Sequence, residues 1–304
     1  MWYYISRGNS FIKEVSLINK EFKNLNLNSS FLFAAVFENP ENCKIMLELL
    51  LGKNIDKITV KSESPMLISS DIKCIRLDVH AIDTYNVNYD IEAQNYESKD
   101  LPRRSRYYQA EMDIASLKPG ETYDKLGDSY IIFICTFDPF GRGLCKYTYE
   151  EICREDGYAL ADGAKRIFFN TSGNDLKNIS DETIQFLKYF ENTTDEYVSS
   201  IDSALIHKLH KKVSELKQSR ELEAGYMKFE ELINRTMEKG RAEGLMSAKK
   251  YILEILERLG SVPEDVIRLV MEENNSEILD RWFRFSIESK TIKEFLNKFN
   301  DSEI

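Results

Sequence analysis

Two carboxylates, Asp78 and Glu92, lie fourteen residues apart in the stretch RLDVHAIDTYNVNYDIEAQ, residues 76–94. On both sides of Tyr85 this stretch alternates apolar and polar side chains, the spacing of a half-buried β-strand, and it therefore predicts a hairpin. A turn centred on Tyr85 places Asp78 directly opposite Glu92, with Cβ atoms about 5 Å apart, where like charges repel. A divalent cation bound by hard oxygen ligands would neutralise them, and such a cation can activate phosphate chemistry.

The register of this hairpin separates apolar and polar side chains onto two faces. One face carries only apolar pairs: Leu77 with Ala93, Val79 with Ile91, and Ala81 with Tyr89. The other face pairs Arg76 with Gln94, Asp78 with Glu92, and His80 with Asp90. Shifting either strand by one residue would put every apolar residue opposite a polar one, so this register is strongly favoured. The alternative to a metal site is an acidic, solvent-facing hairpin whose charge is offset by Arg76 or His80.

A helix is predicted to begin at Pro102 and to end before the KPG turn at residues 118–120. Its first two turns carry three arginines: Arg103, Arg104 and Arg106. Cations are unfavourable there because the N-terminal end of the helix dipole is positive. The cluster therefore indicates a nearby anion, which is the hairpin carboxylates, a nucleic-acid phosphate, or both. Of the two tyrosines that follow, Tyr107 and Tyr108, one can pack in the core while the other reaches a base or phosphate, unless both pack.

The elements that position these residues follow from periodicity and capping signals. A helix is predicted over residues 40–51, with Asn39 as its cap and Gly52 as its stop. Strands are predicted at 55–60, 73–83, 87–94, 129–137 and 165–170. The order of the core elements is therefore helix, three strands, helix, strand.

The rest of the chain is predicted to be helical. Segments 181–192 and 195–240 are charged and periodic, and the weakly hydrophobic stretch 237–250 suggests a junction. Beyond it, capping signals separate three or four short amphipathic helices. We therefore expect two domains, residues 1–240 and residues 246–304, as the length of 304 residues also suggests.

Composition narrows the class of protein. The longest apolar run, residues 130–137, is far shorter than the roughly 20 residues of a membrane helix, and the start lacks the apolar segment of a signal peptide. Five cysteines stand singly with no CxxC pair, which favours reduced thiols in a cytoplasmic protein and no zinc site. A net charge of −10 argues against a surface built wholly for nucleic acid but leaves room for a local basic groove. FGRG at 140–143 lacks the G-K-[ST] ending of a phosphate loop and is interpreted as a turn. No organic cofactor is expected.

Taken together, these motifs resemble the PD-(D/E)XK nuclease superfamily, and more closely its bacterial transposase family, which is related to the Rpn recombination-promoting nucleases. The resemblance covers roughly residues 25–240 and rests on five segments in order: SSFLFAAVFENPENCKIMLELLLG, IRLDVHAID, YDIEAQ, RRSRYYQAEMD and YIIFICTFDPFGRG. It implies an α/β fold with a restriction-endonuclease-like core, αβββαβ, whose mixed central sheet is flanked by helices. The all-helical region that follows is similar to a small helical domain of unassigned function found behind other PD-(D/E)XK-like domains.

The resemblance implies a catalytic set on the hairpin. Asp78 and Glu92 are expected to bind Mg²⁺ or Mn²⁺, which polarises the scissile phosphate and lowers the pKa of an attacking water. Gln94 completes the set, although the superfamily motif usually has lysine there; this branch commonly has E-x-Q. Glu48, on the first helix, matches a position that often supplies a further metal-binding carboxylate, with an exposed helix residue as the alternative.

The helix after the hairpin is expected to support this site. Arg104, Arg106 and Tyr108 match an R-x-R-Y-Y signature, and with Arg103 they are expected to hold phosphate or to support the catalytic set. The implied activity is that of a Mg²⁺-dependent endodeoxyribonuclease acting in recombination or transposition, with DNA as its partner. A double-strand break would need a homodimer or two sequential nicks. The alternative is an inactive nuclease-like fold that binds nucleic acid or protein, which Gln94 and the acidic surface favour.

Overall fold

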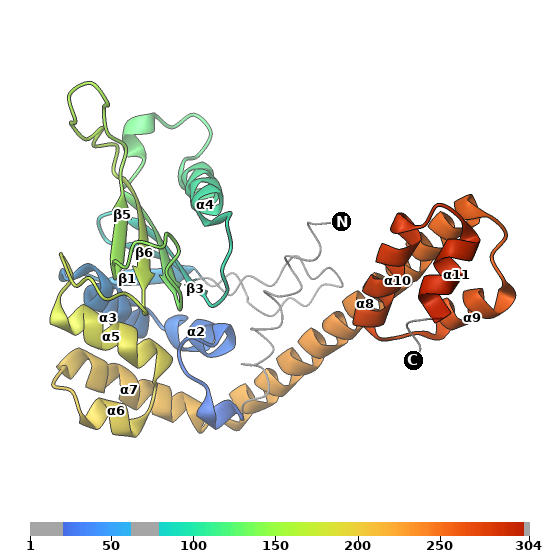
Figure 1. The fold of residues 1–304 in the computed structure, drawn as a ribbon. Coiled ribbons are helices and arrows are strands. Elements are labelled where there is room, and N and C mark those ends of the chain that lie inside the picture. Colours follow the sequence, from blue (N-terminus) through green and yellow to red (C-terminus); the bar gives the residue numbers. More distant parts are fainter. Residues whose placement is uncertain (1–20, 62–78, 301–304) are drawn as a thin grey trace. The chain divides into compact units, whose positions relative to one another are not determined.

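The computed structural model describes residues 21–61 and 79–300 (Figure 1). The chain forms two compact units, Met1–Met227 and Lys228–Ile304. The division falls inside one long helix, α8 (Arg220–Leu259), and the boundary expected from the sequence, between residues 240 and 246, lies in that same helix. The expected junction at 237–250 is thus continuous helix.

The first unit is built on a mixed six-stranded sheet in the order β1-β2-β3-β4-β6-β5. Its strands are β1 (Ile58–Lys61), β2 (Val79–Asp83), β3 (Asn88–Gln94), β4 (Ser129–Cys135), β5 (Lys146–Tyr149) and β6 (Ala164–Asn170). The first three are antiparallel neighbours, β3, β4 and β6 run parallel, and β5 is antiparallel to β6. This sheet confirms the expected α/β class with its helical C-terminal region. The short strand β5 was not predicted from the sequence.

The register predicted for the hairpin is confirmed wherever both strands are described. Val79 lies opposite Ile91, His80 opposite Asp90, and Ala81 opposite Tyr89. The apolar members of these pairs are buried, each with 3% or less of its surface exposed. Asp78, with the rest of the first strand's predicted N-terminal half, lies outside the described residues.

Helices cover both faces of the sheet, and Figure 1 shows α4 (Leu101–Ser116) on one side and α3 (Pro40–Leu51) on the other. Under α4, Leu101 and Met112 pack against inward-facing side chains of β4 and β6. On the opposite side, α3 contacts β1 and β2. As predicted, the Asn39 side chain accepts from the first backbone N–H groups of α3, and Gly52 ends that helix with φ of 64°. Glycine suits this left-handed conformation.

The remaining elements of the first unit are short. They are η1 (Phe22–Asn24), α2 (Ser30–Phe37), η3 (Tyr123–Lys125), α5 (Asp181–Glu191), α6 (Asp195–Ser199) and α7 (Ala204–Lys217). The segment predicted as one periodic stretch from 195 to 240 is therefore divided into α6, α7 and the beginning of α8. Tyr226, near that beginning, packs on the rings of Phe22 and Phe31.

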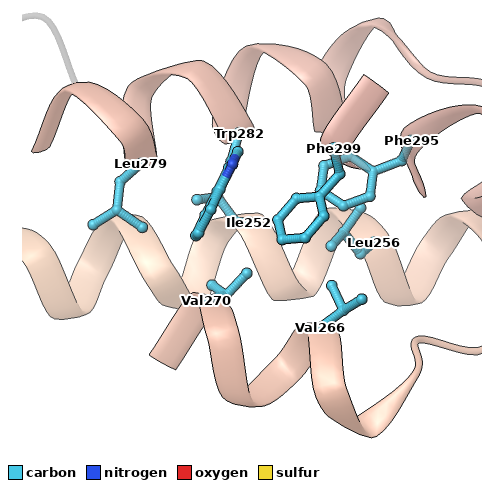
Figure 2. Close-up of a cluster of buried hydrophobic side chains, with 8 residues drawn as sticks. All are labelled: Ile252, Leu256, Val266, Val270, Leu279, Trp282, Phe295 and Phe299. Carbon is cyan, nitrogen blue, oxygen red and sulfur yellow. The ribbon is translucent and has the colours of Figure 1, made fainter. Parts of the chain in front are cut away.

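The second unit combines α8 from Lys228 onward with α9 (Glu264–Glu272), α10 (Ser276–Glu288) and α11 (Ile292–Asn300). Each helix contributes two side chains to one apolar core, as Figure 2 shows: Ile252, Leu256, Val266, Val270, Leu279, Trp282, Phe295 and Phe299. The predicted short amphipathic helices are thus confirmed. Among the helices of the described residues, none is both long enough and apolar enough to cross a membrane.

Candidate active site

The β3 strand directs its polar residues toward α4. Alternation along the strand puts Asn88, Asp90, Glu92 and Gln94 on one face, while Tyr89 and Ile91 face the other way into the core. The Glu92 side chain keeps 17% of its surface exposed, whereas Gln94 is almost completely buried. The strand therefore presents a partly accessible carboxylate with a buried amide two residues further on.

Arg104 of α4 joins these two side chains. Its guanidinium forms an ion pair with Oε1 of Glu92 and donates to Oε1 of Gln94 at 3.2 Å. Gln94 is oriented for this contact because its own Nε2 donates to the carbonyl oxygen of Tyr96 at 2.8 Å. Of the anions that the arginine cluster indicated, the structure thus identifies a hairpin carboxylate as the partner of Arg104.

The guanidinium of Arg104 also lies over two aromatic rings, those of Phe133 and Tyr108. It lies 5.5 Å from the centre of the Phe133 ring and 5.6 Å from that of Tyr108, and it donates to the Tyr108 hydroxyl at 3.3 Å. Burial alone would lower the pKa of Arg104, but the Glu92 carboxylate and the Tyr108 hydroxyl raise it above its ordinary value. Arg104 is therefore a permanent positive charge in a partly dry site.

The donor atoms around this charge fit a hard cation. A carboxylate oxygen and an amide oxygen, from alternate positions of one strand, converge on a single positively charged group. Oxygen donors of this kind are the ligands that Mg²⁺ prefers. Within residues 21–61 and 79–300, no three side chains of the His, Cys, Asp or Glu type form a metal-binding group. Of the residues expected to bind the metal, Glu92 lies on this described face, with the Gln94 amide beside it, and Asp78 lies outside the described residues.

Glu48 has a local set of partners. Its Oε1 accepts from the backbone N–H of Ile55 at 3.0 Å and lies 3.9 Å from Nζ of Lys44. The side chain is 14% exposed, so it is not the exposed helix residue of the alternative interpretation. The contacts described above for Arg104 are with Glu92, Gln94 and Tyr108 and do not include Glu48. Its carboxylate ties the end of α3 to the segment that leads into β1.

The other predicted residues of α4 divide between surface and core. Arg103 and Arg106 are exposed, and Tyr107 keeps 61% of its surface exposed. The Tyr108 ring instead stacks on Phe133, with centroids 6.2 Å apart and planes inclined by 15°. One tyrosine therefore packs and its neighbour faces outward.

A small cavity of about 90 Å³ opens between the hairpin and α4, beside these residues. Its polar lining includes Lys61, His80, Asn88, Asp90, Glu111 and Ser116. Nε2 of His80 lies 3.3 Å from Oδ1 of Asp90, which is 3% exposed. Glu111 was not among the residues predicted from the sequence, although its spacing of seven residues from Arg104 places both on one face of the helix.

The chain was compared with protein-family models, with curated proteins and with solved structures. A family model described as a PD-(D/E)XK nuclease family transposase matches residues 27–239, which include β3, α4 and the whole sheet. No curated protein and no solved structure matched the chain.

Proposed function

Because the chain belongs to the PD-(D/E)XK nuclease family of transposases, we propose that it is a Mg²⁺-dependent endonuclease that hydrolyses phosphodiester bonds in DNA. The family itself supports a nuclease-like function. The metal, the substrate and the residues involved belong to the proposal. Recombination or transposition is the setting that the family suggests.

One observation carries the assignment of the site. The oxygens of Glu92 and Gln94 converge on one cationic group, at the strand positions that correspond to E-x-K of the superfamily motif, with Gln94 in place of the lysine. An ordinary surface carboxylate has no reason to keep only 17% of its side chain exposed beside a buried amide, because burying a charge is costly unless it is compensated. Arg104 supplies that compensation, and this partly accessible charged pair at the motif position supports the proposed site.

Each residue has a distinct role in this proposal. Asp78 and Glu92 hold the divalent cation, with Glu48 as a further candidate ligand. When bound, the cation polarises the scissile phosphate and makes water a stronger nucleophile. Gln94 orients a neighbouring group by hydrogen bonding, since an amide cannot supply charge. The exposed Arg103 and Arg106 contact the DNA backbone, where guanidinium groups pair well with phosphate.

The direct test is cleavage of supercoiled plasmid in Mg²⁺, in Mn²⁺ and in EDTA. Wild-type protein is expected to nick or linearise the plasmid only when a divalent cation is present. Asp78→Ala and Glu92→Gln should abolish cleavage, and Glu92→Gln keeps an oxygen acceptor for Arg104. Glu196→Gln, which neutralises an exposed carboxylate at the start of α6, is the matched control and should cleave normally. Full activity of Glu92→Gln would contradict the assignment.

A second candidate function follows from Gln94 and Arg104. With the motif lysine absent and Glu92 already neutralised, the same fold could bind nucleic acid or protein without cleaving it. Calorimetry distinguishes the two functions, because a binding module has no need of a divalent cation. Failure of wild-type protein to take up Mg²⁺ or Mn²⁺, together with an inert plasmid assay, would favour the binding module.

A further inference from the structure

The superfamily motif usually places a lysine, and so a positive charge, at the position of Gln94. At position 94 the chain carries a neutral amide, so β3 itself brings no cation to the phosphate. Yet a positive charge does lie there, because the Arg104 guanidinium contacts both Gln94 and Glu92 from α4. The charge reaches the site from a different element, ten residues further along the chain.

We propose that Arg104 takes the place of the lysine and competes with the divalent cation for Glu92. Without metal, the guanidinium neutralises Glu92; with metal, it yields that carboxylate and stays beside the phosphate as a fixed positive charge. This inference rests on the proposed nuclease function. It makes Arg104 a catalytic residue that acts on the phosphate directly and limits cation binding through its contact with Glu92.

The contacts of Arg104 allow it to release one partner without leaving the site. Glu92 is one of three acceptors, and the other two, Gln94 and Tyr108, are themselves held in place. The rings of Phe133 and Tyr108 support the guanidinium independently of any hydrogen bond. Losing Glu92 therefore removes the ion pair but leaves the guanidinium anchored near Gln94.

Electrostatics predicts opposite effects on binding and on cleavage. A guanidinium next to Glu92 repels a second cation and occupies its oxygen, so removing the guanidinium should strengthen cation binding. The same guanidinium should stabilise negative charge that develops on the phosphate, so removing it should slow cleavage. A residue with only a structural role would weaken both.

The test compares Arg104→Met with wild type in two measurements on the full chain. Titration of Mn²⁺ by calorimetry, without DNA, should show binding on the order of tenfold tighter in the variant. Plasmid cleavage at saturating Mn²⁺ should be roughly 10²-fold slower. Arg268→Met, the same change at an exposed arginine of α9, is the control and should leave cation affinity and cleavage close to those of wild type.

Arg104→Lys provides a second variant if Arg104→Met does not fold. Lysine keeps the charge, but its single nitrogen cannot span Glu92 and Gln94 as the planar guanidinium does. Its Mn²⁺ affinity should fall between those of wild type and Arg104→Met, and its cleavage should be partly restored. Weaker Mn²⁺ binding in both Arg104 variants would overturn the inference while leaving the nuclease function intact. Absence of Mn²⁺ binding in wild type would overturn both.

Discussion

A Cβ atom placed on Gly127 would lie 1.8 Å from the carbonyl oxygen of Asn86. Asn86 belongs to the turn of the β2–β3 hairpin and adopts φ of 63°, while Gly127 stands just before β4. Immediately after this close approach, the backbone N–H of Asn88 donates to the carbonyl oxygen of Asp128 at 2.8 Å. These two backbone contacts hold the turn of the hairpin against the residues that precede β4. They thereby help to align β3, the strand that carries Glu92.

Substitution Gly127→Ala should therefore destabilise the first unit. The added methyl group must displace backbone on one side or the other, which typically costs about 1–3 kcal/mol. Urea unfolding would show this as a lower midpoint. The control is Gly240→Ala in α8, where a Cβ meets nothing within 4 Å and helix propensity favours alanine by about 0.5–1 kcal/mol. Equal stability of Gly127→Ala and wild type would contradict the importance of this close approach.

The exposed arginines of α4 should contribute to DNA affinity by pairing with phosphates. Replacing Arg103 and Arg106 together by glutamine is expected to weaken binding of unrelated DNA sequences to a similar extent. It should also reduce the slope of log affinity against log salt by about 1 for each phosphate that is no longer neutralised. Fluorescence anisotropy at several salt concentrations, in Ca²⁺ to prevent cleavage, measures both quantities. The matched pair is Arg268→Gln with Arg281→Gln, two exposed arginines of the second unit. An equal weakening in both double variants would point to overall charge alone.

Asp138 should make the loop after β4 sensitive to acid. Partial burial would raise the pKa of its carboxyl, but hydrogen bonds from Tyr147 and from the backbone of Gly143 and Phe140 lower it overall. A lowered pKa means that the stabilisation is complete above the unfolded value of about 3.9 and is lost as pH falls through the folded value.

Asp138→Asn should accordingly be less stable than wild type at pH 7, with a difference that narrows below about pH 4. Urea midpoints at neutral pH, at mildly acidic pH and below about pH 4 would test this. Asp202→Asn, at an exposed aspartate, serves as the control. A difference between Asp138→Asn and wild type that stays constant over this range would argue against the carboxylate as its source.

Lys249 should stabilise the second unit through its buried ammonium. The residue is 7% exposed, and its Nζ donates to the carbonyl oxygen of Met271 at 2.8 Å, near the end of α9. Lys249→Met keeps the chain length but leaves that carbonyl without its donor, at an expected cost of about 1–3 kcal/mol. Lys250→Met removes only a surface pair with Glu254 and should cost under about 1 kcal/mol. Unfolding followed by Trp282 fluorescence, in a Trp2→Tyr background, reports on this unit; matching midpoints for the two variants would contradict the prediction.

Local patterns predicted much of the fold. The helix over 40–51 has the predicted cap, Asn39, and the predicted stop, Gly52. The hairpin register follows from the alternation of apolar and polar residues, because shifting one strand by one residue would bury polar side chains. The strand β5 escaped prediction because its four residues are too few for a clear period. The helix α8 runs through 237–250 despite weak hydrophobicity there, since its residues include many good helix formers.

The sequence identified the candidate site residues but not which of them contact one another. The helix dipole predicts an anion near the α4 arginines but does not say whether it is a carboxylate or a phosphate, because the dipole effect depends on charge alone. Only the packing of α4 over β3 brings Arg104, and not Arg103 or Arg106, onto Glu92. The cavity residues Lys61 and Glu111 likewise come from elements far apart in sequence, so no local pattern connects them.

The strand order β4-β6-β5 has a consequence for folding. The half of the sheet that carries Glu92 can pair in the order in which the chain is made, since β1, β2 and β3 are consecutive neighbours. The other half cannot, because β5 must wait for β6, which comes later in the chain and lies between it and β4. Pairs between distant segments form more slowly than local hairpins. Pulse-labelling hydrogen exchange during refolding should therefore protect the β2–β3 amides first and those of β5 last.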